Sequence, residues 1–187
     1  MVEHGKELSF PLWDSFLPVL VSLSQVSDIG VKQAACFGLG ICAEVGGDKF
    51  KPVFRKSLEA LVKVVQRPDS RDDEKTAGPT ENAISSIGRI LKFQHSCFAP
   101  NEYEEVMSLW LSCLPLEWDE VEARVCHSHF ISLIFNQSQL VLGPQLNNLP
   151  RVLTVFSACL ANPELIENVK IVHELLQKLQ TELPPGV

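Results

Sequence analysis

The sequence lacks the features that mark several large protein classes. It has six widely spaced cysteines and no Cys-x-x-Cys pair, so a disulfide framework is not indicated. The first seven residues include glutamates and form no apolar stretch, which is unlike a signal peptide. No apolar run approaches the roughly 20 residues that span a bilayer. These absences predict a reduced, soluble protein of the cytoplasm or nucleus, without a membrane partner.

Clustered positive charge is also missing. Lysine and arginine number 16 against 23 aspartates and glutamates, for a formal net charge of -7. Nucleic-acid binding depends on grouped cations, so a nucleic-acid partner is not expected. Hydrophobic residues make up 45% of the 187 residues and charged residues 21%, a globular balance. An acidic surface of this kind favours solubility and could attract basic partners.

Strand-like alternation is absent, whereas helical periodicity runs through the whole chain. Apolar residues recur at the spacing of one helix face in several segments. These segments contain Phe54 to Val65, Tyr103 to Leu114, Leu149 to Leu160 and Leu165 to Leu179. The sequence therefore predicts an all-α protein.

Helix boundaries are marked by capping residues, prolines and glycines. Asp119 with Glu122, and Asn101 with Glu104, are spaced like capping boxes,. Pro52 and Pro163 are expected at first helical positions. Gly46-Gly47 and Gly143-Pro144 are expected to end helices. The polar segment 68–79 is expected to be an exposed loop.

The predicted helices form pairs near residues 12–45, 52–93, 102–135 and 148–181, and we expect one domain over 1–187. Leu20, Leu61, Leu109 and Leu153 occupy similar places in the first helix of each pair, so the period is close to that of HEAT repeats. Each pair has apolar residues on more than one side, and stacking of neighbouring pairs would bury them. The predicted fold is an α-α superhelix of HEAT type; a compact helical bundle is the alternative.

The second helix of the first pair is the most informative segment. Its Asp28, Val31-Lys32, Ala34-Ala35 and Leu39-Gly40 follow the HEAT pattern of aspartate, valine with a cation, small residues and leucine-glycine. We expect Asp28 to cap the helix. Small residues such as Ala34 and Gly38 would let a neighbouring helix approach closely.

Several motifs together resemble the importin-β (karyopherin-β) family, in its C-terminal region of the importin-5 type. The resemblance covers about residues 28–155. It is carried by the helix Thr80-Glu81-Asn82-Ala83-Ile84-Ser85-Ser86-Ile87-Gly88-Arg89-Ile90-Leu91-Lys92-Phe93, by Trp110 to Leu116 and Val141 to Pro150, and by Gln33 to Gly40 with Gly46-Gly47-Asp48.

The resemblance implies nuclear import and residence in both nucleus and cytoplasm. Receptors of this family are HEAT superhelices that bind basic cargo and Ran-GTP inside and phenylalanine-glycine nucleoporins outside. The family's Ran-binding repeats lie at its N-terminal end and have no counterpart here. We therefore expect a C-terminal fragment or truncated product, with Ran-GTP bound only by a full-length receptor. An uncovered first repeat could also cause self-association.

Motifs that suggest chemistry have simpler explanations, and neither an enzyme, a cofactor nor a metal is expected. Gly38-Leu39-Gly40 to Ala43 resembles a nucleotide fingerprint but continues a helical stripe. In Cys126-His127-Ser128-His129 the two histidines would point to nearly opposite sides of a helix; Cys126 is expected in the core and the histidines partly exposed. The acidic segment 69–74 lacks the spacing of a calcium loop.

The candidate partner-binding residues lie on second helices, which line the concave face of a HEAT stack. They are Glu81, Asn82 and Arg89 in one repeat, with Ser85, and Glu120 and Arg124 in the next, with His127. Acidic members could bind basic segments through charge-assisted hydrogen bonds, and charge reversal at Glu81 and Glu120 would test this. The alternatives are an ordinary solvated helix face and a HEAT scaffold that assembles a complex, such as a phosphatase or kinase, without transport.

Overall fold

The computed structural model describes residues 6–182; the N-terminal residues 1–5, which bear on the signal-peptide prediction, lie outside them. Eight α-helices and five short 3-10 helices make up the described chain, and no strand occurs between residues 6 and 182. The fold is all-α, an α-α superhelix of HEAT type, as predicted. The chain divides into two compact units, 1–106 and 107–187.

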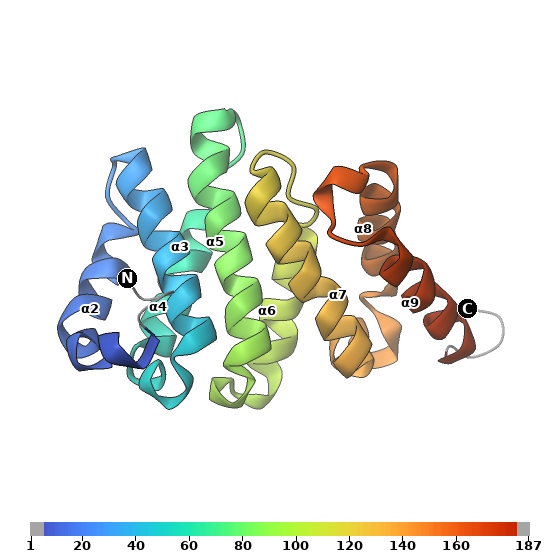
Figure 1. The fold of residues 1–187 in the computed structure, drawn as a ribbon, viewed down its shortest axis with the longest axis horizontal. Helices are drawn as coiled ribbons and strands as arrows, with labels where there is room; N and C mark the ends of the chain where they lie inside the picture. Colours follow the sequence, from blue (N-terminus) through green and yellow to red (C-terminus); the bar gives the residue numbers. More distant parts are fainter. Residues whose placement is uncertain (1–5, 183–187) are drawn as a thin grey trace. The chain divides into compact units, whose positions relative to one another are not determined.

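In unit 1 the helices pair in the order predicted from the sequence. Its elements are η1 (Lys6–Leu12), α2 (Trp13–Leu23), α3 (Ile29–Val45), η2 (Gly47–Lys49), α4 (Lys51–Val65), α5 (Glu74–Phe93), η3 (His95–Cys97) and the first half of α6 (Pro100–Ser112). Helix α5 packs against both α3 and α4, and α2 packs against α3 and α4 (Figure 1). The core of this unit is therefore built around α3 and α5.

Unit 2 contains the second half of α6 and three further α-helices. Its remaining elements are α7 (Glu120–Leu142), η4 (Pro144–Leu146), α8 (Leu149–Ala161), η5 (Pro163–Leu165) and α9 (Val169–Glu182). Helix α7 contacts η5 and α9, and α8 contacts α9. Trp110, Phe130 and Phe156, each at most 1% exposed, form the aromatic centre of its core.

Helices α3 and α5 approach each other at a small-residue contact. A Cβ placed on Gly40 would lie 2.9 Å from Cβ and 3.0 Å from Cα of Ser86, so only glycine fits there. The hydroxyl of Ser86 donates to the Cys36 carbonyl at 2.8 Å. The expectation of close packing is confirmed, also at Gly38, where a Cβ would lie 3.2 Å from the Leu20 side chain of α2.

Capping residues set most helix ends where the sequence placed them. The Asp28 carboxylate accepts from the Val31 N–H at 2.9 Å, and that of Asp119 accepts from the Glu122 N–H at 3.0 Å. Gly46 and Gly143 are the C-caps of α3 and α7. Pro52 lies in the first turn of α4, where its missing N–H is harmless.

Four boundaries differ from prediction. Helix α7 continues to Leu142, beyond the predicted end near residue 135. Helix α5 begins at Glu74, inside the segment predicted as a loop, because Asp73 and Thr76 form a capping box and Pro79 is accommodated within the helix. At α6 the Glu102 carboxylate accepts from the Ala99 N–H, so the helix starts before the predicted Asn101 cap. Pro163 begins a 3-10 turn, and α9 starts only at Val169.

Between residues 6 and 182 no helix combines the length and apolar character that a bilayer span requires.

The cysteines predict a two-class labelling pattern. All six lie within residues 6–182 and none forms a disulfide; Cys97 and Cys113 are half-buried, whereas the other four are buried. Burial raises the pKa of Cys36 and of Cys42 to about 12 and that of Cys159 to about 11. Since the thiolate is the reactive form, we expect rapid reaction of only two thiols with an aromatic disulfide reagent at pH 8.

Counting the released chromophore tests this expectation. The Cys97→Ser and Cys113→Ser variants should each lose one rapid equivalent, and denaturant should expose all six thiols. Rapid labelling of Cys36 or Cys42 in the folded chain would contradict the packing of α3.

Candidate partner-binding site

Arg89, predicted to face a partner, lies inside unit 1. Its side chain is 2% exposed. Its Nε lies 3.2 Å from a carboxylate oxygen of Glu44, and its Nη1 donates to the Ser85 hydroxyl at 2.9 Å. The guanidinium also stacks over Phe37 at 5.6 Å. Arg89 therefore joins α5 to α3, and the expectation that it lies on a solvated face is wrong.

Glu81 and Asn82 are buried as well. Glu81 is fully buried and pairs with Arg71 at 3.1 Å. The Asn82 amide donates to the Gly78 carbonyl at 3.1 Å. The apolar periodicity predicted that these polar residues would be exposed, and this prediction is wrong. Polar groups of a central helix can be buried because they form hydrogen bonds or ion pairs within the fold. Charge reversal at Glu81 would consequently disturb folding and could not report on a partner.

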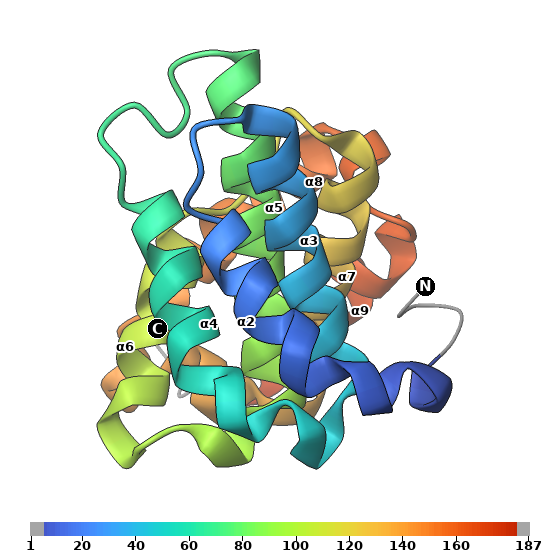
Figure 2. The ribbon, with the colours of Figure 1, turned by 90° about the vertical axis from the view of Figure 1, so that its left-hand side faces the viewer.

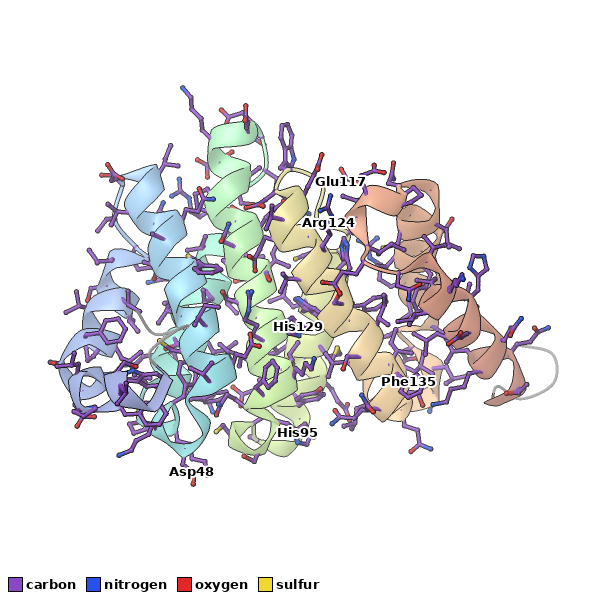
Figure 3. All side chains as sticks on the ribbon, in the orientation of Figure 1. Asp48, His95, Glu117, Arg124, His129 and Phe135 are labelled. Atoms are coloured by element: carbon purple, nitrogen blue, oxygen red, sulfur yellow. The ribbon has the colours of Figure 1, made fainter. Side chains whose placement is uncertain are left out.

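Glu120 and Arg124 differ from the α5 residues because they are exposed. They lie in the first turns of α7, with 63% and 45% of their side chains exposed and 3.7 Å between their charged atoms. Nε of Arg124 also donates to the Glu164 carbonyl at 2.7 Å. Figure 3 places Arg124 near one end of α7 and Phe135 near the other. Partner binding by Glu120 and Arg124 stays a prediction.

His127 fastens the segment between α8 and α9 to α7. The prediction of partial exposure is wrong for both histidines, since His127 is fully buried and His129 is 7% exposed. The Leu116 N–H donates to Nε2 of His127 at 3.1 Å, and Nδ1 lies 2.8 Å from the Leu165 carbonyl. A carbonyl can only accept, so Nδ1 carries the proton and the ring is neutral. Both nitrogens are thereby committed to the backbone.

Helices α7 and α9 border a groove within unit 2. The groove has a volume of about 430 Å³, within the range of small-ligand and peptide-side-chain pockets. Its lining residues come from the middle of α7 and the start of α9: Ser128, Ile131, Ser132, Phe135, Asn136, Glu167, Asn168, Ile171 and Glu174.

An apolar floor and an acidic rim characterise this groove. Phe135 and Ile171 are 54% and 38% exposed, which is unusual for large apolar side chains flanking one hollow. Glu167 and Glu174 are exposed on the same side, and within residues 6–182 neither forms an ion pair. The groove is therefore suited to a segment that offers both apolar and positively charged side chains.

Lys178 fixes one end of the groove. Its Nζ donates to the Phe135 carbonyl at 2.9 Å and lies 4.7 Å from the centre of the Phe135 ring. The contact lies two residues before Gln137, where α7 departs from helical geometry. Phe135 of α7 is thus in contact with α9 through Lys178.

None of the groove residues was singled out from the sequence. One signal was present: Phe135 falls near the end of α7, away from the Cys126, Phe130 and Ile134 stripe that is buried. The pairing of Phe135 with Ile171 depends on how α9 returns across α7, which periodicity does not specify.

These features define a class: a helical-repeat protein of HEAT type with an exposed groove between second helices. Three curated proteins align with most of the chain. A probable importin-5 homolog of Dictyostelium discoideum is 30% identical over 150 residues, 78% of this chain. Importin subunit beta-3 of Saccharomyces cerevisiae is 27% identical over 141 residues, 75% of the chain. Human importin-4 is 27% identical over 162 residues, 86% of the chain.

The chain belongs to the importin-β (karyopherin-β) family. It spans only 14%, 13% and 14% of the length of these three relatives. No family model matches it.

Proposed function

We propose that this chain forms part of a nuclear import receptor of the importin-5 type and that its α7–α9 groove binds basic segments of cargo proteins. The role is that of a non-catalytic binding scaffold, shared between cytoplasm and nucleus. Family membership supports the transport role. The acidic rim and apolar floor of the groove support the choice of ligand.

The main support for cargo binding is the negative charge of the groove, which is complementary to the basic cargo segments expected of such a receptor. Glu167 and Glu174 can form charge-assisted hydrogen bonds with lysine or arginine, while Phe135 and Ile171 accept an apolar side chain. Glu120 is also exposed on α7, but its charge is shared with Arg124, 3.7 Å away. Rim charges mainly govern association rate and specificity, so binding should weaken as salt is raised.

Charge reversal at the rim tests this function. We expect the Glu167→Lys/Glu174→Lys variant to bind a short fluorescent peptide of lysine, arginine and phenylalanine on the order of tenfold more weakly. Fluorescence anisotropy of the labelled peptide at two salt concentrations provides the measurement. Glu120→Lys should give a smaller loss, because Glu120 lies outside the groove lining.

Glu104→Lys/Glu105→Lys is the matched control. Glu104 and Glu105 are exposed acids of α6 that form no ion pair within the described residues, and reversing both changes the net charge by the same amount as the rim variant. Equal weakening by this control would mean that overall charge, and not the groove, explains the effect. Unchanged affinity in the Glu167→Lys/Glu174→Lys variant would show that the groove does not bind the basic peptide.

A HEAT scaffold without transport function is the alternative, and it makes a different prediction. A transport receptor should bind phenylalanine-glycine nucleoporin repeats, whereas a plain scaffold has no reason to do so. Ran-GTP is proposed to bind only in a full-length receptor. Sedimentation of the isolated chain over a concentration series would test the predicted self-association.

A further inference from the structure

The charged side chains that line a second cavity, in unit 1, are mainly positive, whereas those that line the α7–α9 groove are acidic. It lies beneath the loop that joins α4 to α5, beside the beginning of α3; Figure 2 shows this loop and the start of α3 at the same end of the unit. Its volume is about 150 Å³, room for about five water molecules at ~30 Å³ each. Three cations, Lys32, Arg67 and Lys75, contribute to its wall.

Lys32 is the unusual member of this wall. It is 7% exposed, and within residues 6–182 its Nζ has neither a hydrogen bond nor an ion pair. Two hydroxyls of the wall, those of Ser27 and Ser70, likewise have no hydrogen bond within the described chain. The wall of the cavity therefore contains hydrogen-bond donors that have no acceptor within the described residues.

Helix geometry adds to the positive potential. The cavity is lined by Ile29, the first residue of α3, and by Lys75 and Thr76 in the first turn of α5. The N-termini of two long helices therefore face it, and each dipole favours a negative charge there. Neither of the capping aspartates of these helices, Asp28 and Asp73, lines the cavity.

Asp69 is the one carboxylate in the wall, and it is already engaged. Arg67 binds it through two hydrogen bonds, of 3.1 and 2.9 Å. The pKa of Asp69 is lowered, first by the hydrogen bond from Arg67 and further by the charges of Arg67 and Lys32. Lys32 and Lys75 form no hydrogen bond or ion pair through their ammonium groups within the described residues, so the wall carries three cations against one carboxylate.

We propose that this cavity is a binding site for a phosphate group, held by Lys32 and Lys75 with the hydroxyls of Ser27 and Ser70. A tetrahedral dianion suits donors that converge from several directions, and it is small enough for the cavity. The phosphate group comes either from solution, with the Ser70 hydroxyl as one of its donors, or is an ester on Ser70 itself, in which case Lys32, Lys75 and the Ser27 hydroxyl hold it. The site is separate from the α7–α9 groove and independent of the proposed cargo binding.

The first test uses inorganic phosphate and the full chain. Titration followed by 31P line broadening, at constant ionic strength with chloride as reference, should show binding that Lys32→Met weakens at least about tenfold. Lys63→Met, which removes an exposed α4 lysine outside the cavity wall, should leave binding unchanged. Asp69→Asn should strengthen binding, because it removes the competing carboxylate and releases Arg67.

The second test distinguishes the two sources. In a chain carrying phosphoserine at position 70, an ester seated in the cavity should titrate below its usual second pKa of about 6, and Lys32→Met should restore the usual value. The modified chain should then no longer bind free phosphate. An ester that titrates normally, with phosphate binding retained, would identify free phosphate as the ligand.

The proposal fails if the unmodified chain binds no phosphate and the phosphoserine titrates normally. It fails equally if Lys32→Met and Lys63→Met have the same effect on both measurements, since the cavity would then contribute nothing beyond net charge. Circular dichroism of each variant establishes that the helices are intact.

Discussion

Substituting Gly40 with valine should destabilise unit 1 by more than about 3 kcal/mol. Even the Cβ of alanine would lie 2.9 Å from Cβ and 3.0 Å from Cα of Ser86, and a backbone atom cannot move aside cheaply. The Ser86 side chain is also held, because its hydroxyl donates to the Cys36 carbonyl. The branched side chain of valine would force α3 and α5 apart over their contact. Urea denaturation followed by helical circular dichroism measures the loss.

Gly30, in the same helix, provides the control. A Cβ there meets only the Asp28 carboxylate, at an ordinary 3.7 Å. Gly30→Ala should therefore be neutral or stabilising by up to ~1 kcal/mol, since alanine favours helix more than glycine does. If Gly40→Ala and Gly30→Ala gave the same unfolding midpoint, the close approach of α3 and α5 would be refuted.

The second large effect is expected at Phe130. Its fully buried ring lies between Trp110, 6.3 Å away between ring centres, and Phe156, at 5.1 Å. Phe130→Ala should cost ~3–5 kcal/mol, because it loses the transfer free energy of the ring and leaves a cavity between three helices. A lowered urea midpoint for unit 2 would provide the measurement, with Trp110 fluorescence as a local probe.

Phe135 is the matched position, on the same helix but 54% exposed. Phe135→Ala should change stability by less than ~1 kcal/mol, since little area is removed from a packed environment. It should instead weaken the basic peptide in the groove. The reverse outcome, with Phe135 the more damaging to stability, would contradict the assignment of Phe130 to the core and Phe135 to the surface.

Apolar periodicity predicted much of the fold because each helix buries one stripe. Trp110, Leu61 and Val152 are buried as their spacing indicates. The start of α5 was missed because its first turn is polar and depends on the local hydrogen bonds of Asp73 and Thr76. Pro79 also suggested a loop, although a proline near the beginning of a helix removes few hydrogen bonds.

The candidate site was harder to predict than the fold. Sequence reasoning treated Glu81 and Arg89 as exposed because they are charged, yet their partners Arg71 and Glu44 lie 10 and 45 residues away. Nothing in the local pattern reveals such pairing. Conversely, the groove depends on the path of α9 after its 3-10 turn, which is fixed by Arg124 and His127 through backbone carbonyls.

The end of α6 depends on a residue from a later helix. Arg151 of α8 donates to the carbonyls of Leu111 and Ser112, each at 2.9 Å, and to that of Leu114. The carbonyls of Leu111 and Ser112 are the last of α6, and a helix cannot satisfy its last carbonyls by itself.

The last turn of α6 and the first turn of α8 are consequently coupled in their folding. In a repeat protein, the strength of the interactions between neighbouring helix pairs determines whether these pairs unfold separately or together. A single arginine side chain thus links two helix pairs into one cooperative segment. Loss of α8 would fray the end of a helix that lies almost 40 residues earlier in the chain.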